Sequence, residues 1–104
     1  MSEPVPQHPA EFLRLCDEAV ESLRALIPAD AHRRGELIPG VRALLERIDQ
    51  QVEELDLRAP GFAAEQGALI DAASALQSID LDRGGPHVPR FVERAIADIR
   101  RVAG

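Results

Sequence analysis

At 104 residues the chain has about the length of one domain, which is enough to close a single hydrophobic core without disulfides. Its formal net charge of −6 argues against binding to DNA or RNA, because an acidic surface repels phosphate backbones. No apolar stretch approaches the roughly 18 residues of a membrane-spanning helix, and the first residues lack the basic start and apolar run of a secretory signal. With a single cysteine and no possible internal disulfide, we expect a cytoplasmic protein that spans no membrane.

Residues 1–8 contain Pro4 and Pro6 and no apolar periodicity, which predicts a flexible tail ahead of one domain over 9–104. From Phe12 onward, apolar residues recur at steps of three and four, which predicts a helix over about 9–27. Pro28 should end this helix. Cys16 lies within the apolar stripe, so we expect a buried thiol rather than a reactive one.

Residues 28–38 are expected to form a loop with one helical turn near 30–36. Asp30 is suited to cap such a turn, whereas Gly35 and Pro39 should interrupt any longer helix. The next helix is then predicted over about 39–57, before the break at 59–61. Its apolar positions are Val41, Leu44, Leu45, Ile48, Val52 and Leu55.

The third predicted helix, about 61–79, is apolar around most of its circumference, which is typical of a helix that is central in its domain or buried on two sides. One face has larger side chains, namely Phe62, Leu69, Ile70, Ala73 and Leu76. The second face has Ala64, Ala68, Ala72, Ala75 and Ile79. Because small side chains let another backbone approach closely, we expect Ala64, Ala68, Ala72 and Ala75 to pack inside the bundle or to mediate a homodimer.

A fourth helix is predicted over about 87–102, with apolar residues on one side from Val88 to Val102. Four helices joined by short breaks predict an all-α, up-down-up-down four-helix bundle. An alternative arrangement packs the same helices more obliquely, with 28–38 as a fifth short helix.

No catalytic, cofactor-binding or metal-binding set is evident. His8, His32 and His87 are not spaced to share a metal ion, and no cofactor is expected. The segment His32-Arg33-Arg34-Gly35 is similar to the signature of phosphotransfer bundles, except that glycine follows the histidine at three positions instead of four. The segment Arg47–Leu55 resembles the long first helix of all-α chorismate mutases, which hold a dianionic substrate with arginines and a lysine. This chain contains no lysine.

Four acidic residues lie along one side of the second predicted helix, at i, i+3, i+7 and i+10. They are Glu46, Asp49, Glu53 and Asp56. This acidic ridge, relieved mainly by Arg42, is either a solvated helix face or a surface for a partner protein with basic side chains.

We therefore expect a non-enzymatic protein–protein interaction module of the adaptor, immunity, antitoxin or chaperone type, which binds its partner through a helical face. The alternative is a small all-α enzyme or ligand-binding bundle whose arginines line an anion pocket, between helices or across a dimer. A polar cluster facing the core would favour the alternative.

Overall fold

The computed structural model describes residues 10–56 and 63–103, which form four α-helices and no strand. The helices are α1 (Ala10–Arg24), α2 (Ala31–Asp56), α3 (Ala63–Leu81) and α4 (Val88–Ala103). The predicted all-α four-helix bundle is therefore confirmed. The predicted tail at 1–8 lies outside the described residues.

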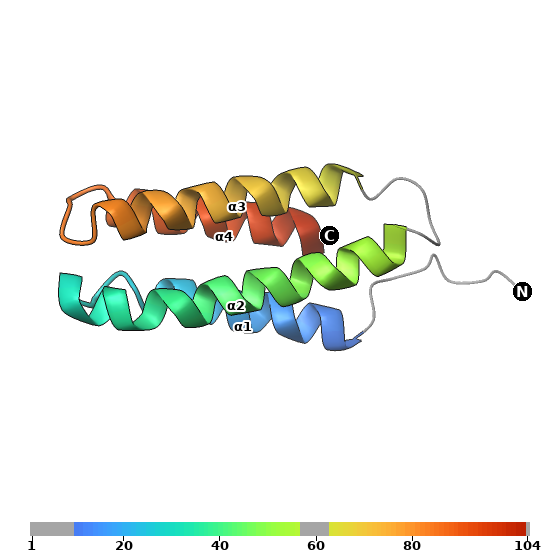
Figure 1. The fold of residues 1–104 in the computed structure, drawn as a ribbon, viewed down its shortest axis with the longest axis horizontal. Helices are drawn as coiled ribbons and strands as arrows, with labels where there is room; N and C mark the ends of the chain where they lie inside the picture. The colour runs from blue at the N-terminus through green and yellow to red at the C-terminus, as the bar shows by residue number, and fades with distance from the viewer. Residues whose placement is uncertain (1–9, 57–62, 104) are drawn as a thin grey trace, which may run out of the picture.

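Successive helices run in opposite directions, as Figure 1 shows, so the bundle has the up-down-up-down topology. Within the described ranges α1 packs on α2, α2 on α3, α3 on α4 and α4 on α1, while the backbones of the two diagonal pairs stay more than 8 Å apart. The connections 25–30 and 82–87 lie together at one end of the bundle, and α1 begins and α4 ends toward the other end.

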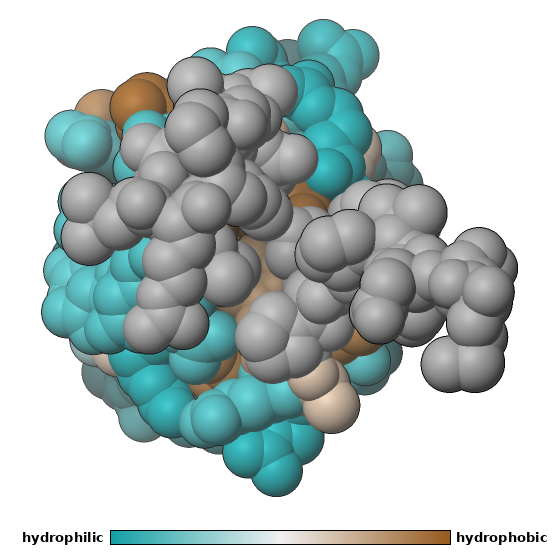
Figure 2. Space-filling view, turned by 90° about the vertical axis from the view of Figure 1, so that its right-hand side faces the viewer, coloured by the Kyte–Doolittle hydropathy of each residue, from teal (hydrophilic) through white to brown (hydrophobic). Residues whose placement is uncertain are grey.

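Among the described residues the core is built from aliphatic side chains, Cys16 and one fully buried aromatic, Phe12. Each helix contributes one buried stripe, and α4 shows the pattern most clearly, with Val88, Val92, Ile99 and other residues inward and its arginines outward. Figure 2 shows the end of the bundle, where hydrophilic side chains make up most of the circumference and patches of hydrophobic ones are visible toward the centre. Burial of this apolar surface is the main force that holds the helices together.

The prediction that Gly35 and Pro39 interrupt the second helix is wrong, because α2 begins at Ala31 and continues through Pro39. Asp30 caps it as expected: its Oδ1 accepts a hydrogen bond from the Arg33 backbone N–H at 2.8 Å. A proline inside a helix costs about 3 kcal/mol, mainly through one lost hydrogen bond and a clash with the preceding turn. Anchoring on both sides of Pro39 outweighs this cost, since Ile38 and Val41 are buried in the core.

Arg34 supplies the anchor on the N-terminal side. Its Nε donates to the Leu26 carbonyl at 2.7 Å, its Nη2 to the Ile27 carbonyl at 3.0 Å and its Nη1 to the Arg83 carbonyl. The side chain is 9% exposed, so these bonds satisfy a buried cation with backbone oxygens from both connections at this end. Arg34 thereby fixes the first turn of α2 against the rest of the bundle.

The connection after α1 also differs slightly from the expected boundary. The α-helix ends at Arg24, and the chain continues to Pro28 in tighter turns, with hydrogen bonds from the Leu26 and Ile27 N–H groups three residues back. Leu26 is fully buried, whereas Ile27, at the end of the helix expected over 9–27, is 36% exposed.

Candidate functional site: the groove between α2 and α3

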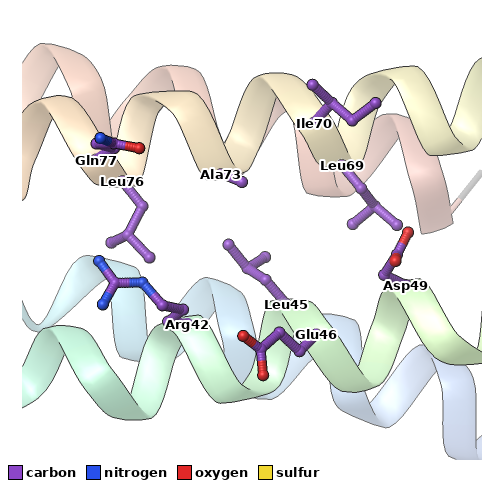
Figure 3. A pocket seen from close by; sticks show the side chains of 9 residues that line it. All are labelled: Arg42, Leu45, Glu46, Asp49, Leu69, Ile70, Ala73, Leu76 and Gln77. Atoms are coloured by element: carbon purple, nitrogen blue, oxygen red, sulfur yellow. The ribbon is translucent and has the colours of Figure 1, made fainter.

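A groove of about 320 Å³ runs between α2 and α3 (Figure 3). Its floor is apolar, because it is formed by the buried side chains of Leu45, Leu69 and Leu76. Near the connection 82–87, the Arg42 Nη2 atom lies 3.4 Å from Asp80 Oδ2 and joins the two helices across the groove. An open concavity with an apolar floor is a candidate binding site.

The α2 wall of this groove is acidic. Glu46 and Asp49 line the groove directly, and Glu53 lies one helical turn beyond Asp49. None of the ion pairs found among the described residues involves these three carboxylates. Arg42, expected to relieve the ridge, is instead paired with Asp80. Asp56, the fourth residue of the ridge, belongs to α2, but its side chain lies outside the described residues.

Apart from Asp80, which is paired with Arg42, the described residues of the α3 wall are uncharged. Ile70, Ala73 and Gln77 form it, at i, i+3 and i+7, and all three are exposed. Ile70 is 66% exposed and adds accessible apolar surface to the edge of the groove. The sequence grouped Ile70 and Ala73 with the buried Leu69 and Leu76. The helix is rotated so that these two lie outside the core at the groove.

The alanine face of α3 is internal in this structure. Ala68 is 1% exposed, Ala72 0% and Ala75 5%, which fits the first of the two expected alternatives, packing inside the bundle. The side chain of Ala64 lies outside the described residues. Self-association through α3 stays a prediction, and the residues of α3 that are accessible to a second chain include Ile70, Ala73 and Gln77 of the groove wall.

A second groove, of about 590 Å³, lies between α1 and α4 and is the nearest match to the expected arginine-lined pocket. Arg24 and Arg100 line it, but Glu93 lies in the same groove. The Arg24 Nη1 atom is also 2.9 Å from Glu21 Oε1, so carboxylates offset the positive charge. This arrangement has little net attraction for an anion.

Asp98, on the edge of α4 that faces α3, is a buried charged residue that the sequence pattern did not reveal. It is 5% exposed, its Oδ1 lies 3.5 Å from Arg101 Nη1, and its Oδ2 has no hydrogen-bond partner. Burial raises the pKa of the Asp98 carboxyl above its ordinary value; the nearby Arg101 acts in the opposite direction, and Asp71 adds to the increase.

The remaining candidates carry little chemistry. Cys16 is buried as predicted, and burial together with the neighbouring Asp17 raises the pKa of its thiol to about 11. His32 is exposed in the first turn of α2, 3.1 Å from Glu36 Oε1.

In the described ranges no group of three or more His, Cys, Asp or Glu side chains is placed to hold a metal ion. None of the four described helices has an apolar stretch of the length needed to cross a bilayer.

The groove between α2 and α3 thus combines an accessible apolar surface with unpaired carboxylates. Comparisons with protein-family models, with curated proteins and with solved structures find no match for this chain.

Proposed function

We propose that this protein is a non-enzymatic interaction module that binds a partner with a basic surface on the face formed by α2 and α3. The observation that carries the proposal is the position of Glu46 and Asp49 at the edge of an apolar groove. Unpaired carboxylates steer a basic partner during association, and the apolar floor supplies binding energy once water is displaced. A cytoplasmic location is part of this proposal.

The alternative, an anion-binding bundle or small enzyme, has weaker support. Two charged residues are buried in the described part of the chain, Arg34 and Asp98, and they lie on α2 and α4, which are diagonal to each other in the bundle. Each of the three guanidinium nitrogens of Arg34 already donates to a backbone carbonyl, and Asp98 has the wrong charge for an anion site. The polar core cluster that would favour this alternative is therefore not formed by these two residues.

The proposal is tested by reversing the acidic ridge and repeating the capture of the native partner. Affinity purification with crosslinking from the native cell identifies the partner, and a variant with Glu46, Asp49, Glu53 and Asp56 replaced by arginine should lose it. Circular dichroism should remain helical, because the described members of the ridge lie outside the buried stripe of α2.

A matched control reverses four acidic residues of α1, which changes the net charge by the same amount on another surface. These residues are Glu11, Asp17, Glu18 and Glu21, all of them exposed. The control should keep the partner. Equal capture by the ridge variant across a salt series would contradict the proposal, because screening by salt must weaken a charge-steered complex.

A further inference from the structure

We infer that the partner presents an amphipathic α-helix with basic residues along one edge only, and that this helix lies in the groove between α2 and α3. The inference rests on the proposed function and goes further, because it assigns the secondary structure, the charge pattern and the anchoring position of the bound segment.

The helical form follows from the chemistry of the groove. Its floor is made of the side chains of Leu45, Leu69 and Leu76, and the backbone groups beneath them are already used inside α2 and α3. A segment that docks there receives no backbone hydrogen bonds from the floor, and a helix suits such a surface because it satisfies its own. Two antiparallel helices also offer rows of side chains between which a third helix can pack.

The one-sided charge follows from the difference between the two walls. Beyond the Arg42–Asp80 pair, Glu46 and Asp49 make the α2 wall acidic, whereas Ile70 and Gln77 make the α3 wall uncharged. A docked helix therefore places its apolar stripe on the floor, its basic edge against α2 and an uncharged edge against α3. Basic residues on both edges would leave one row of cations without partners.

The small side chain of Ala73 marks the anchoring position. In Figure 3, Ala73 and Leu45 point toward each other from α3 and α2, with open space between them. A leucine, isoleucine, methionine or phenylalanine of the partner fits against this opening, as apolar anchors do in helix-binding grooves.

A second copy of this chain is a poor occupant for the same reasons. Among the described helices, α4 is the one with a row of exposed arginines, at Arg90, Arg94 and Arg101. Its apolar stripe, however, is buried in its own bundle, so it cannot present both features at once.

The test uses a synthetic helical peptide with a leucine stripe and lysines along one edge, titrated into the isotope-labelled full chain. Amide chemical shifts should change in residues 42–49 and 69–77. A scrambled peptide of the same composition, and a peptide with glutamates in place of the lysines, should bind at least ~10-fold more weakly. Equal binding of the scrambled peptide, or shifts elsewhere on the bundle, would overturn the inference.

Two substitutions to glutamate separate docking from simple charge attraction. Ala73→Glu should weaken the peptide by at least ~10-fold, because it puts a carboxylate where the apolar anchor lies. Ala97→Glu, at an exposed alanine of α4, is the matched control and should bind like the wild type. If the partner were held by charge alone, Ala73→Glu would bind it more tightly, which has the opposite sign and would refute the groove.

The direction of the bound helix tests the asymmetry of the walls. A peptide with its lysines on the other edge of the leucine stripe should bind in the opposite chain direction. Rotating the helix by half a turn about the axis perpendicular to the groove floor keeps the leucines on the floor, exchanges the two edges and reverses the direction of the chain. A spin label on the peptide N-terminus should then broaden signals near Arg42 for one peptide and near Asp49 for the other. Broadening at the same end for both would show that the acidic wall does not orient the helix.

The outcomes distinguish the inference from the function on which it rests. Loss of the native partner in the ridge variant but not in Ala73→Glu would leave the proposed function standing and remove the groove-bound helix. Retention of the partner in both variants would remove both. Sedimentation of the wild type as a dimer, with groove signals that change with protein concentration, would assign the groove to a second copy and overturn the inference.

Discussion

Arg34 and Asp98 are both buried and ionisable, but their surroundings differ. The Arg34 guanidinium donates to three backbone carbonyls from two connections, so its charge is solvated by the protein. Asp98 has one long contact with Arg101 and an oxygen with no donor. The comparison indicates that a buried charge stabilises a fold when its surroundings replace the hydrogen bonds of water, and costs free energy when they do not.

The largest expected effect comes from removing the satisfied charge. Arg34→Met keeps a long apolar stem but leaves the carbonyls of Leu26, Ile27 and Arg83 without their donor, and should lower the free energy of unfolding by about 3 kcal/mol or more. Urea denaturation measures this loss. The neighbouring Arg33→Met is the control and should cost less than about 0.5 kcal/mol, because Arg33 is exposed. Equal effects of the two substitutions would break the comparison.

Replacing Pro39 should change the free energy of unfolding by a somewhat smaller amount, at the same end of α2. Pro39→Ala restores a backbone N–H for the Gly35 carbonyl and should raise the free energy of unfolding by about 1 to 3 kcal/mol. If Arg34 is what holds the start of α2 in place despite the proline, the gain should be larger in the Arg34→Met background. A double-mutant cycle measures this coupling. Strictly additive effects would show that Arg34 and Pro39 act independently.

Removing the unsatisfied charge of Asp98 should stabilise the fold, which is opposite to the effect expected for Arg34→Met. Asp98→Asn removes the buried carboxylate and should raise the free energy of unfolding at neutral pH by about 1 kcal/mol. Asp71→Asn, the control, should have the same sign and a smaller size, because Asp71 is exposed. Destabilisation by Asp98→Asn at neutral pH would mean that the ionised carboxylate makes a favourable interaction.

The difference in free energy of unfolding between the wild type and Asp98→Asn should also depend on pH. Because the pKa of Asp98 is raised in the folded state, its protonated form is favoured there, and the wild type gains stability relative to Asp98→Asn as the pH falls through the raised pKa. The advantage of the variant should therefore be largest above that pKa and disappear below the ordinary value of 3.8. Thermal unfolding across this pH range measures it.

Cys16 is a third kind of buried titratable group, one that stays neutral. The prediction for it concerns the rate of thiol modification and is the smallest of the expected effects. With a pKa of about 11, the thiol is protonated at neutral pH and needs no charged partner. A thiol reagent should modify it slowly in the native protein and rapidly in denaturant. Fast native labelling would show that the stripe of α1 opens readily.

The parts of the fold that depend on local sequence were predictable. The residues bounding α4 differ by one from those expected, because its apolar stripe and flanking prolines and glycines act within a few residues. The start of α2 was not predictable in this way. Its anchor, Arg34, bonds to Arg83, 49 positions away in sequence, and that contact outweighs the local preference of Pro39 to end a helix.

The candidate site was predictable only in part. The spacing of Glu46, Asp49 and Glu53 placed them on one side of α2, which the structure confirms for the two that line the groove. The groove itself depends on how α3 is rotated between α2 and α4, because this rotation buries Ala68 and Ala72 and exposes Ile70 and Ala73. Both faces of α3 are apolar, so periodicity could not choose between them.

The ring of four helices also has a kinetic consequence. Three of its four packing interfaces join helices that follow each other along the chain, and only the interface of α1 with α4 joins distant segments. Chains dominated by contacts at short sequence separation fold rapidly, within roughly microseconds to milliseconds, because little loop-closure entropy is lost before contacts form. We therefore expect the two helical hairpins to form early and the docking of α1 on α4 to complete folding.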